Sequence, residues 1–255
     1  MDTLTTLLPI SLWVMAFIIA VLGGFVKGVV GFAMPMVMIS GLSTFMEPEL
    51  ALAGLIVPTL ITNVAQALRQ GIGAALASAK RFWIYLVVGG VMLVASAQLV
   101  RVLPISVMVG LIGFPVTGFA VLQLIGLRFR LARQRADVEA GIGAFAGFLG
   151  GISGIWGPPT VLYLTALDTE KSEQMRAQGV IYGLGALALV GAHLGSGVLR
   201  AETLPLSLAL VLPALAGQWL GGQVLDRVDQ ALFRKATLVV LLVAGLNLIR
   251  RALTG

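Results

Sequence analysis

The sequence predicts an all-α polytopic membrane protein built from two inverted repeats, and three observations support this fold class. Of its 255 residues, 58% are hydrophobic and only 11% are charged, whereas soluble domains average about 25% charged residues. Apolar stretches long enough to cross a bilayer recur along the whole chain. A phrase rich in glycine and ending in proline occurs twice, once in each of the two longest stretches.

Eight apolar stretches divide the chain. They span residues 7–45, 50–68, 82–100, 104–127, 138–167, 177–199, 203–225 and 232–249. A helical crossing takes about 20 residues, so six stretches fit one crossing each, while the first and the fifth are too long for one. All acidic residues, and every basic residue except Lys27, fall at the ends of these stretches or between them. This separation of charge from apolar sequence supports the assignment of spans.

The repeated phrase reads GFVKGVVGFAMP at residues 24–35 and GFLGGISGIWGP at residues 147–158. The two copies lie 123 positions apart and share Gly24, Phe25, Gly28, Gly31 and Pro35 at equivalent places. Glycine is conformationally permissive and proline removes a backbone donor, so we expect each helix to break here. In lipid, such a break is tolerated only where it faces protein or a watery cavity. Interrupted helices at matching places in two halves indicate a transporter's binding site.

The duplication extends beyond the breaks, because residues 122–125 (LQLI) resemble residues 246–249 (LNLI). We therefore predict a single membrane domain with repeat one at 1–127, a cytoplasmic linker at 128–137 and repeat two at 138–255. Each repeat would hold a broken helix pair, re-entrant or hairpin-like, followed by three transmembrane helices.

The basic connections predict the orientation of the chain. Residues 69–81, 128–135 and 227–235 carry most of the arginines and lysines, so the positive-inside rule places all three in the cytoplasm. This is consistent only if the fifth stretch enters and returns on one side. Its arms, 138–152 and 155–167, look short for full crossings, and the first stretch should behave alike. Each repeat then makes an odd number of net crossings, so the two repeats are inverted. Arg250 and Arg251 favour parallel repeats instead, because the inverted arrangement would place these two arginines outside the cell.

Inverted repeats would bring the two breaks together near mid-membrane, where free amide groups at helix N-termini attract anions. Lys27, the only charge deep in an apolar stretch, could complement an anion there. Two plainer interpretations stay open. Glycines four apart also allow close helix packing, and a lysine can extend its ammonium group to the membrane interface. The residues predicted to bind substrate are Lys27, Gly28, Gly31, Pro35, Asn63, Gly151, Ser153, Gly154, Trp156, Gly157, Pro158 and Arg176.

Composition excludes several other functions. The chain has no cysteine and one histidine, His193, which argues against a cysteine- or histidine-bound metal; no cofactor is expected. The net charge of +6 does not indicate nucleic-acid binding, because the basic residues lie between apolar spans. The expected partners are a small anion and the lipid bilayer, with a homo-oligomer left open.

An enzymatic alternative comes from Ser153 and His193, whose surroundings resemble the serine and histidine motifs of rhomboid intramembrane proteases. Against it, the first copy of the phrase has Val30 in place of the serine, and Pro158 would disrupt the helix that the serine motif starts. We therefore expect no enzymatic activity.

The two phrases and the four-plus-four layout resemble the sulfite exporter TauE/SafE family over nearly the whole chain. The resemblance implies a multi-pass permease of the bacterial inner membrane. It would move small anions such as sulfite, thiosulfate, sulfonates or sulfoacetate by alternating access. Members often have a denser glycine cluster before the first proline, whereas this chain has Phe32, Ala33 and Met34. The alternative within transport is a carrier of a carboxylate or a metal ion.

Overall fold

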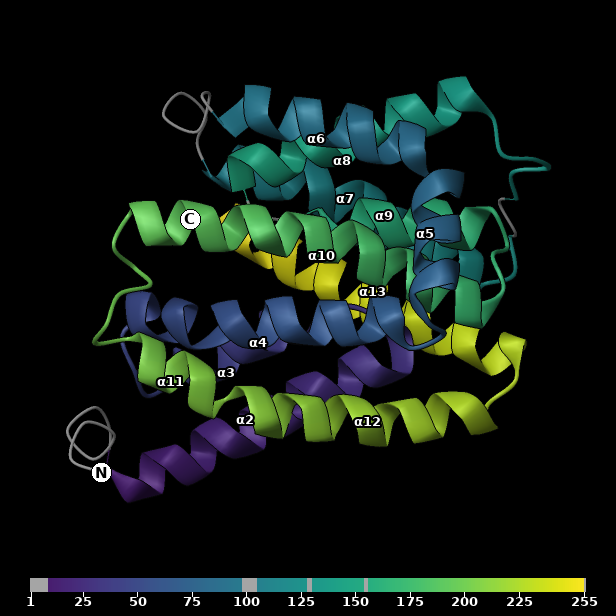
Figure 1. Ribbon diagram of the computed structural model, residues 1–255. Coiled ribbons are helices and arrows are strands. Elements are labelled where there is room, and N and C mark those ends of the chain that lie inside the picture. Colours follow the sequence, from purple (N-terminus) through teal and green to yellow (C-terminus); the bar gives the residue numbers. More distant parts are fainter. Residues whose placement is uncertain (1–8, 98–104, 128–129, 154–155, 255) are drawn as a thin grey trace. The chain divides into compact units, whose positions relative to one another are not determined.

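The computed structural model describes residues 9–97, 105–127, 130–153 and 156–254, and these residues are helical apart from turns and short connections (Figure 1). The helices are α2 (Ile10–Val30), α3 (Met34–Leu42), α4 (Pro48–Leu68), α5 (Ile72–Arg81), α6 (Trp83–Ala97), α7 (Ile105–Leu124), α8 (Ala136–Ser153), α9 (Gly157–Ala166), α10 (Lys171–Gly195), α11 (Leu204–Ala209), α12 (Val211–Arg227) and α13 (Gln230–Thr254).

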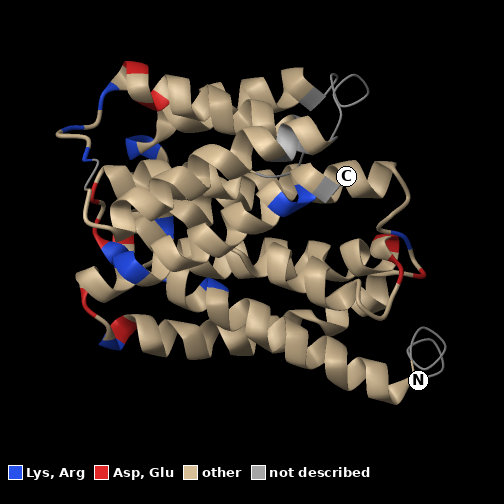
Figure 2. Ribbon diagram, turned by 180° about the vertical axis from the view of Figure 1, so that it is seen from behind, with Lys and Arg blue, Asp and Glu red and all other residues tan. Residues whose placement is uncertain are grey.

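Membrane-length helices confirm the predicted fold class. Five helical spans are long and apolar enough to cross a bilayer: Ile10–Val30, Pro48–Leu68, Lys171–Gly195, Leu204–Arg227 and Gln230–Leu253. A sixth is obtained if α5 and α6, which meet at an angle of 73°, are counted together. Charged residues lie chiefly at helix ends and in connections, as Figure 2 shows. The chain is therefore a multi-pass membrane protein.

The predicted repeat reappears in the helices themselves. Moving α2 by the 123 positions that separate the two phrases places its last residue, Val30, on Ser153, the last residue of α8. The same shift places α3 on α9, α4 on α10, α6 on α12 and α7 on α13. One prediction needs correction: residues 72–81, expected to be a connection, form the helix α5.

In each unit, one pair of equivalent helices runs antiparallel, as inverted repeats require. Gly113 of α7 packs against Ile249 of α13, while Gly110, three residues earlier, lies beside Ala252, three residues later. Residue numbers therefore rise along α7 as they fall along α13. In the same way, Gly179 of α10 lies against Ala67 of α4, and Gly183 against Asn63.

The chain divides into two compact units, and neither unit is a repeat. Unit 1 comprises Met1–Ala75 and Gln178–Val228, and unit 2 comprises Leu76–Ala177 and Asp229–Gly255. In unit 1, α2 from repeat one packs against α12 from repeat two; in unit 2, α8 from repeat two packs against α6 from repeat one. The first helix of each repeat thus has its main neighbour in the other repeat.

Small residues allow α2 to approach α12, and α8 to approach α6, closely. A Cβ atom on Gly24 would lie 2.1 Å from the carbonyl oxygen of Ala214, and one on Gly28 would lie 2.3 Å from that of Gln218. In unit 2, a Cβ atom on Gly147 would lie 2.1 Å from the carbonyl oxygen of Gly89. Glycines four apart therefore serve helix packing here, as small residues do in membranes generally.

The first break is a hairpin in unit 1. Helix α3 folds back along α2, so that Met34 and Met38 lie beside Gly23 while Gly41 lies beside Ile19. The apolar core below includes Trp13, Met38, Leu42, Leu55 and Leu210. The first stretch therefore folds back at its break, while its entry and exit on one side of the membrane stay a prediction. The arms differ in length, however: α2 has 21 residues and α3 has 9, while α8 has 18 and α9 has 10. Neither α8 nor α9 is among the described helices that are long and apolar enough to cross a bilayer, as predicted for the arms of the fifth stretch.

Candidate functional site

The first break is a three-residue turn between α2 and α3. Gly31 caps α2 with a left-handed backbone, φ 88°, and donates its N–H to the Lys27 carbonyl at 2.7 Å. Ala33 also has a positive φ, 74°, which costs a residue with a Cβ atom about 1–2 kcal/mol. Pro35 follows in the first turn of α3, where a missing N–H breaks no helical bond. The glycine ends the first helix and the proline begins the second.

Two glutamine amides satisfy the backbone carbonyls that this break frees. Gln66 of α4 donates its Nε2 to the Gly31 carbonyl at 3.1 Å. The side-chain amide of Gln178 on α10 lies against the carbonyls of Val30 and Gly31, and with its nitrogen assigned to that side it donates to both at 3.2 Å. Both side chains are buried. The last carbonyls of a helix lack partners within it, so these amides allow α2 to end inside the protein.

Lys27 lies one turn before the break and is buried, with 2% of its surface exposed. Its Nζ donates a hydrogen bond to Oδ1 of Asn63 on α4. No ion pair of Lys27 is recorded among the residues that the structure describes. A buried ammonium group normally has a counter-charge, because removing a charge from water is costly. Lys27 and Asn63 together form a buried cationic site beside the break.

Neutral polar groups complete the surroundings of this site. Thr62 donates its hydroxyl to the Pro58 carbonyl at 2.6 Å. Gln218 of α12 donates its Nε2 to the Thr62 carbonyl at 2.9 Å. The side-chain oxygen Oε1 of Gln218 is buried and has no hydrogen-bond partner among the described residues. We call the group of Lys27, Thr62, Asn63, Gln66, Gln178 and Gln218 the first-break cluster.

The first break lies toward one end of its helices. Gln66, which binds the Gly31 carbonyl, precedes Arg69 by three residues, about 4.5 Å along a helix. Arg69 is 41% exposed and pairs with Asp226 of α12 at 2.6 Å. This break therefore lies close to the charged ends of α4 and α12, and its predicted position near mid-membrane stays a prediction.

The second break, in unit 2, has a different character. Helix α8 ends at Ser153, Gly151 lies in its last turn, and Gly157 and Pro158 form the first turn of α9. The hydroxyl of Thr160 donates to the carbonyl of Trp156 at 2.8 Å and lies 2.6 Å from the hydroxyl of Tyr85. Gly154 lies outside the described residues. The prediction that the two breaks face each other across a substrate stays a prediction.

The two breaks differ in chemistry at the position of Lys27. Its equivalent in repeat two is Gly150, and a Cβ atom there would lie 3.2 Å from Cβ and 3.1 Å from the ring of Trp156. Trp156 is in turn the equivalent of Ala33. Repeat one therefore combines the long side chain of Lys27 with the small one of Ala33, whereas repeat two combines Gly150 with the large side chain of Trp156. Of the two repeated phrases, only the first contains a basic residue.

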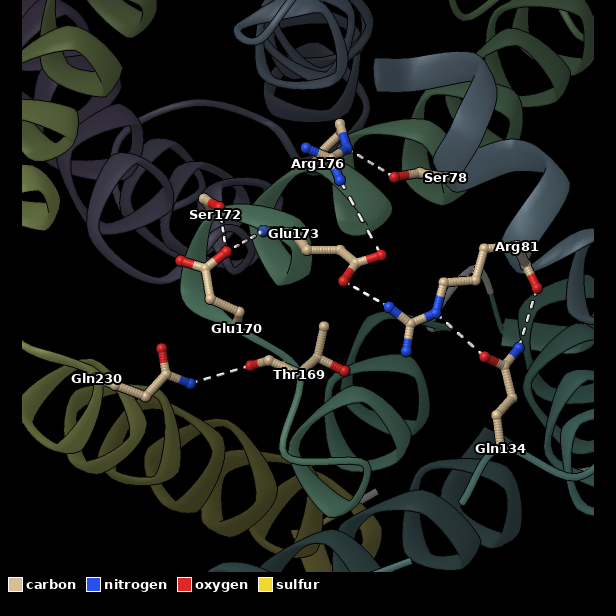
Figure 3. A network of polar contacts seen from close by, with 9 residues as sticks. All are labelled: Ser78, Arg81, Gln134, Thr169, Glu170, Ser172, Glu173, Arg176 and Gln230. Atoms are coloured by element: carbon tan, nitrogen blue, oxygen red, sulfur yellow. Dashed lines mark hydrogen bonds and ion pairs between the residues drawn. The ribbon is translucent and has the colours of Figure 1, made fainter. Parts of the chain in front are cut away.

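Arg176 belongs to a surface network near the start of α10, drawn in Figure 3. It donates from Nε to the Ser78 hydroxyl at 2.7 Å and lies 4.0 Å from a carboxylate oxygen of Glu173. Glu173 also pairs with Arg81 at 2.5 Å, and Arg81 bonds Gln134 of the linker at 3.1 Å. Because its charge is shared with a carboxylate, Arg176 is a weaker candidate for substrate binding than Lys27.

Sequence reasoning found part of this arrangement. The fold brings Lys27, Gly31 and Asn63 together in unit 1. Gly28 serves instead to pack α2 against α12, and Pro35 begins α3. The role of Gln218 was missed. An amide within an apolar stretch was the available signal, but such amides often join helices without contacting substrate.

A comparison with protein-family models matched residues 16–248 to the model described as "Sulfite exporter TauE/SafE". The chain belongs to the sulfite exporter TauE/SafE family. Membership makes it a membrane permease and confirms the resemblance noted in the sequence. No curated protein and no solved structure matched the chain.

Family membership does not support the protease alternative, because TauE/SafE proteins are transporters. His193 has a hydrogen-bonding contact with Ser196 at 3.5 Å. Within the described part of the chain, no group of three or more metal-ligating side chains could hold a metal ion.

Proposed function

We propose that this TauE/SafE permease carries small sulfur oxyanions or organosulfonates, such as sulfite, thiosulfate or sulfoacetate, and that Lys27 binds them. The observation that carries the proposal is the buried ammonium group of Lys27, whose recorded partner is a neutral amide. An anion would supply the counter-charge that a buried cation requires. Sulfur oxyanions are the substrate class that the family's name indicates.

The cluster offers hydrogen bonds as well as charge. A protonated lysine has three N–H donors, and the structure records one of them bonded to Asn63. The remaining donors could bind oxygens of a tetrahedral or pyramidal anion. The first turn of α3 begins at the same break, and free amides there favour negative charge.

The division into two units supports alternating access. Each unit holds one of the two broken helix pairs, and each combines helices from both repeats. Transporters with inverted repeats commonly move one bundle against another around a site at broken helices. We propose that substrate binding at Lys27 is coupled to such a movement in the bacterial cytoplasmic membrane. A small anion and the bilayer are the proposed partners; nucleic acid is not.

The direct test compares transport of labelled sulfite by vesicles containing wild-type protein, Lys27→Met or Lys80→Met. Methionine keeps the length of lysine without its charge, and Lys80, which is exposed, provides the matched control. We expect Lys27→Met to reduce transport at least about tenfold while Lys80→Met transports normally. Normal transport by Lys27→Met would refute the site assignment.

A second variant separates loss of binding from loss of folding. Asn63→Asp would place a carboxylate where the amide oxygen now accepts the Lys27 hydrogen bond, giving the lysine an internal counter-charge. The variant should fold and yet fail to be stabilised thermally by sulfite. Competition by unlabelled acetate tests the alternative that the permease carries carboxylates.

A further inference from the structure

The charge inventory of unit 1 limits what its site can accommodate. Among the described residues of this unit, Lys27 is the only charged side chain that is buried. Arg69 pairs with Asp226, and Arg200 pairs with Glu49 at 2.7 Å and Glu202 at 3.4 Å. These side chains are 41–71% exposed, so water screens them.

The other members of the first-break cluster are electrically neutral. Asn63, Gln66 and Thr62 come from α4, Gln218 from α12 and Gln178 from α10. None of these side chains titrates near neutral pH. From α3, the nearest contribution is Met34, whose sulfur lies 3.7 Å from the Thr62 hydroxyl. Lysine is therefore the only titratable side chain in the cluster.

Helix dipoles add little net charge at this break. The C-terminal end of α2 and the N-terminal end of α3 adjoin within three residues, and their partial charges, about −0.5 and +0.5, oppose each other. The negative end is further satisfied by the amides of Gln66 and Gln178. With Lys27 protonated, the site in unit 1 thus carries close to one positive charge.

We infer that this site selects singly charged anions over doubly charged ones. The inference rests on the proposed role of Lys27 and narrows its substrate class. A sulfonate or hydrogen sulfite would neutralise the lysine, whereas a dianion would leave one negative charge buried without a partner. Breaking the charge balance of a buried pair is strongly unfavourable. Alkylsulfonates and hydrogen sulfite are then preferred over sulfate, thiosulfate and sulfoacetate.

Methanesulfonate and sulfate make the sharpest pair of probes, because both are tetrahedral and similar in size but carry one and two charges. Binding to purified full-length protein can be measured by thermal stabilisation over a concentration series. We expect methanesulfonate to bind wild-type protein at least about tenfold more tightly than sulfate. Equal or tighter binding of sulfate would overturn the inference while leaving the proposed anion site in place.

Sulfite itself provides an independent test, because it changes between one and two charges near neutral pH. Its affinity relative to methanesulfonate, which keeps one charge throughout, should fall as the pH rises. Taking this ratio cancels any change in the charge of Lys27. A constant or rising ratio would contradict the preference for single charge.

The Lys27→Met variant tests the anion site itself, separately from its preference for singly charged anions. It should lose binding of methanesulfonate, while Lys80→Met keeps it. If wild-type protein binds neither anion, or if Lys27→Met binds methanesulfonate as wild-type does, the proposed site at Lys27 fails and the inference with it.

Discussion

The side chain of Trp156 lies over Gly150, at the place in repeat two that corresponds to Lys27 in repeat one. Two copies of one broken helix have thus diverged into a cationic site and an aromatic one. In the second, the tryptophan occupies space that a residue larger than glycine would need. The large side chain of Trp156 therefore requires a residue as small as glycine at position 150.

This coupling predicts a non-additive pair of substitutions. Gly150→Ala would place its Cβ atom 3.1–3.2 Å from Trp156, which we expect to destabilise the protein by about 1–3 kcal/mol. In a Trp156→Ala background the same change should cost much less. Thermal unfolding of the wild type, both single variants and the double variant forms a complete cycle. Equal costs of Gly150→Ala in the two backgrounds would show that the residues are not coupled.

Close packing of α8 against α6 predicts opposite results for two glycines of one helix. A Cβ atom on Gly147 would lie 2.1 Å from the backbone oxygen of Gly89, whereas one on Gly141 would meet nothing within 4 Å. Gly147→Ala should therefore destabilise the protein by about 3 kcal/mol, because backbone must move. Gly141→Ala should be neutral or slightly stabilising, since alanine favours a helix. Unfolding temperatures of the two variants test this, and equal values would contradict the close approach.

A buried carboxylate provides the next prediction. Glu139 of α8 is 1% exposed and accepts the backbone N–H of Tyr85, in the first turn of α6, at 3.1 Å. Glu139→Ala would leave that N–H unpaired and should cost about 1–3 kcal/mol. Glu139→Gln keeps an oxygen acceptor and should cost clearly less. Unfolding in detergent measures both; a larger loss for glutamine would indicate that the negative charge itself is required.

The breaks and the repeat could be predicted from sequence because they depend on local chemistry. Gly31 and Pro35 determine where one helix ends and the next begins, and the same spacing 123 residues later places the end of α8 at Ser153. Counting crossings against the positions of arginine and lysine predicted inverted repeats, and the antiparallel pairs α4/α10 and α7/α13 agree with them. These features require no knowledge of which helices meet.

Helix partners could not be predicted, because small residues four apart permit close packing without specifying a partner. Nothing in the spacing of Gly24 and Gly28 indicates that α12, almost 200 residues later, lies against them. The same limit applies to Gln178, whose amide binds carbonyls about 150 residues earlier in the chain. The position of the first break relative to its neighbouring helices depends on these contacts, which the sequence does not specify.

The final prediction concerns membrane sidedness, which the ion pairs of unit 2 make testable. Asp168 pairs with Arg130 of the linker at 3.0 Å and with Arg234 of α13 at 2.8 Å, so the linker and the start of α13 lie at one end of this unit. Helix α13 has 25 residues, about 37 Å, and therefore ends across the bilayer. The chain lacks cysteine, so Arg133→Cys, Lys235→Cys and Arg251→Cys each create a unique label site. An impermeant thiol reagent applied outside intact cells should label only Arg251→Cys; labelling of all three, or of Lys235→Cys alone, would refute the inverted repeat.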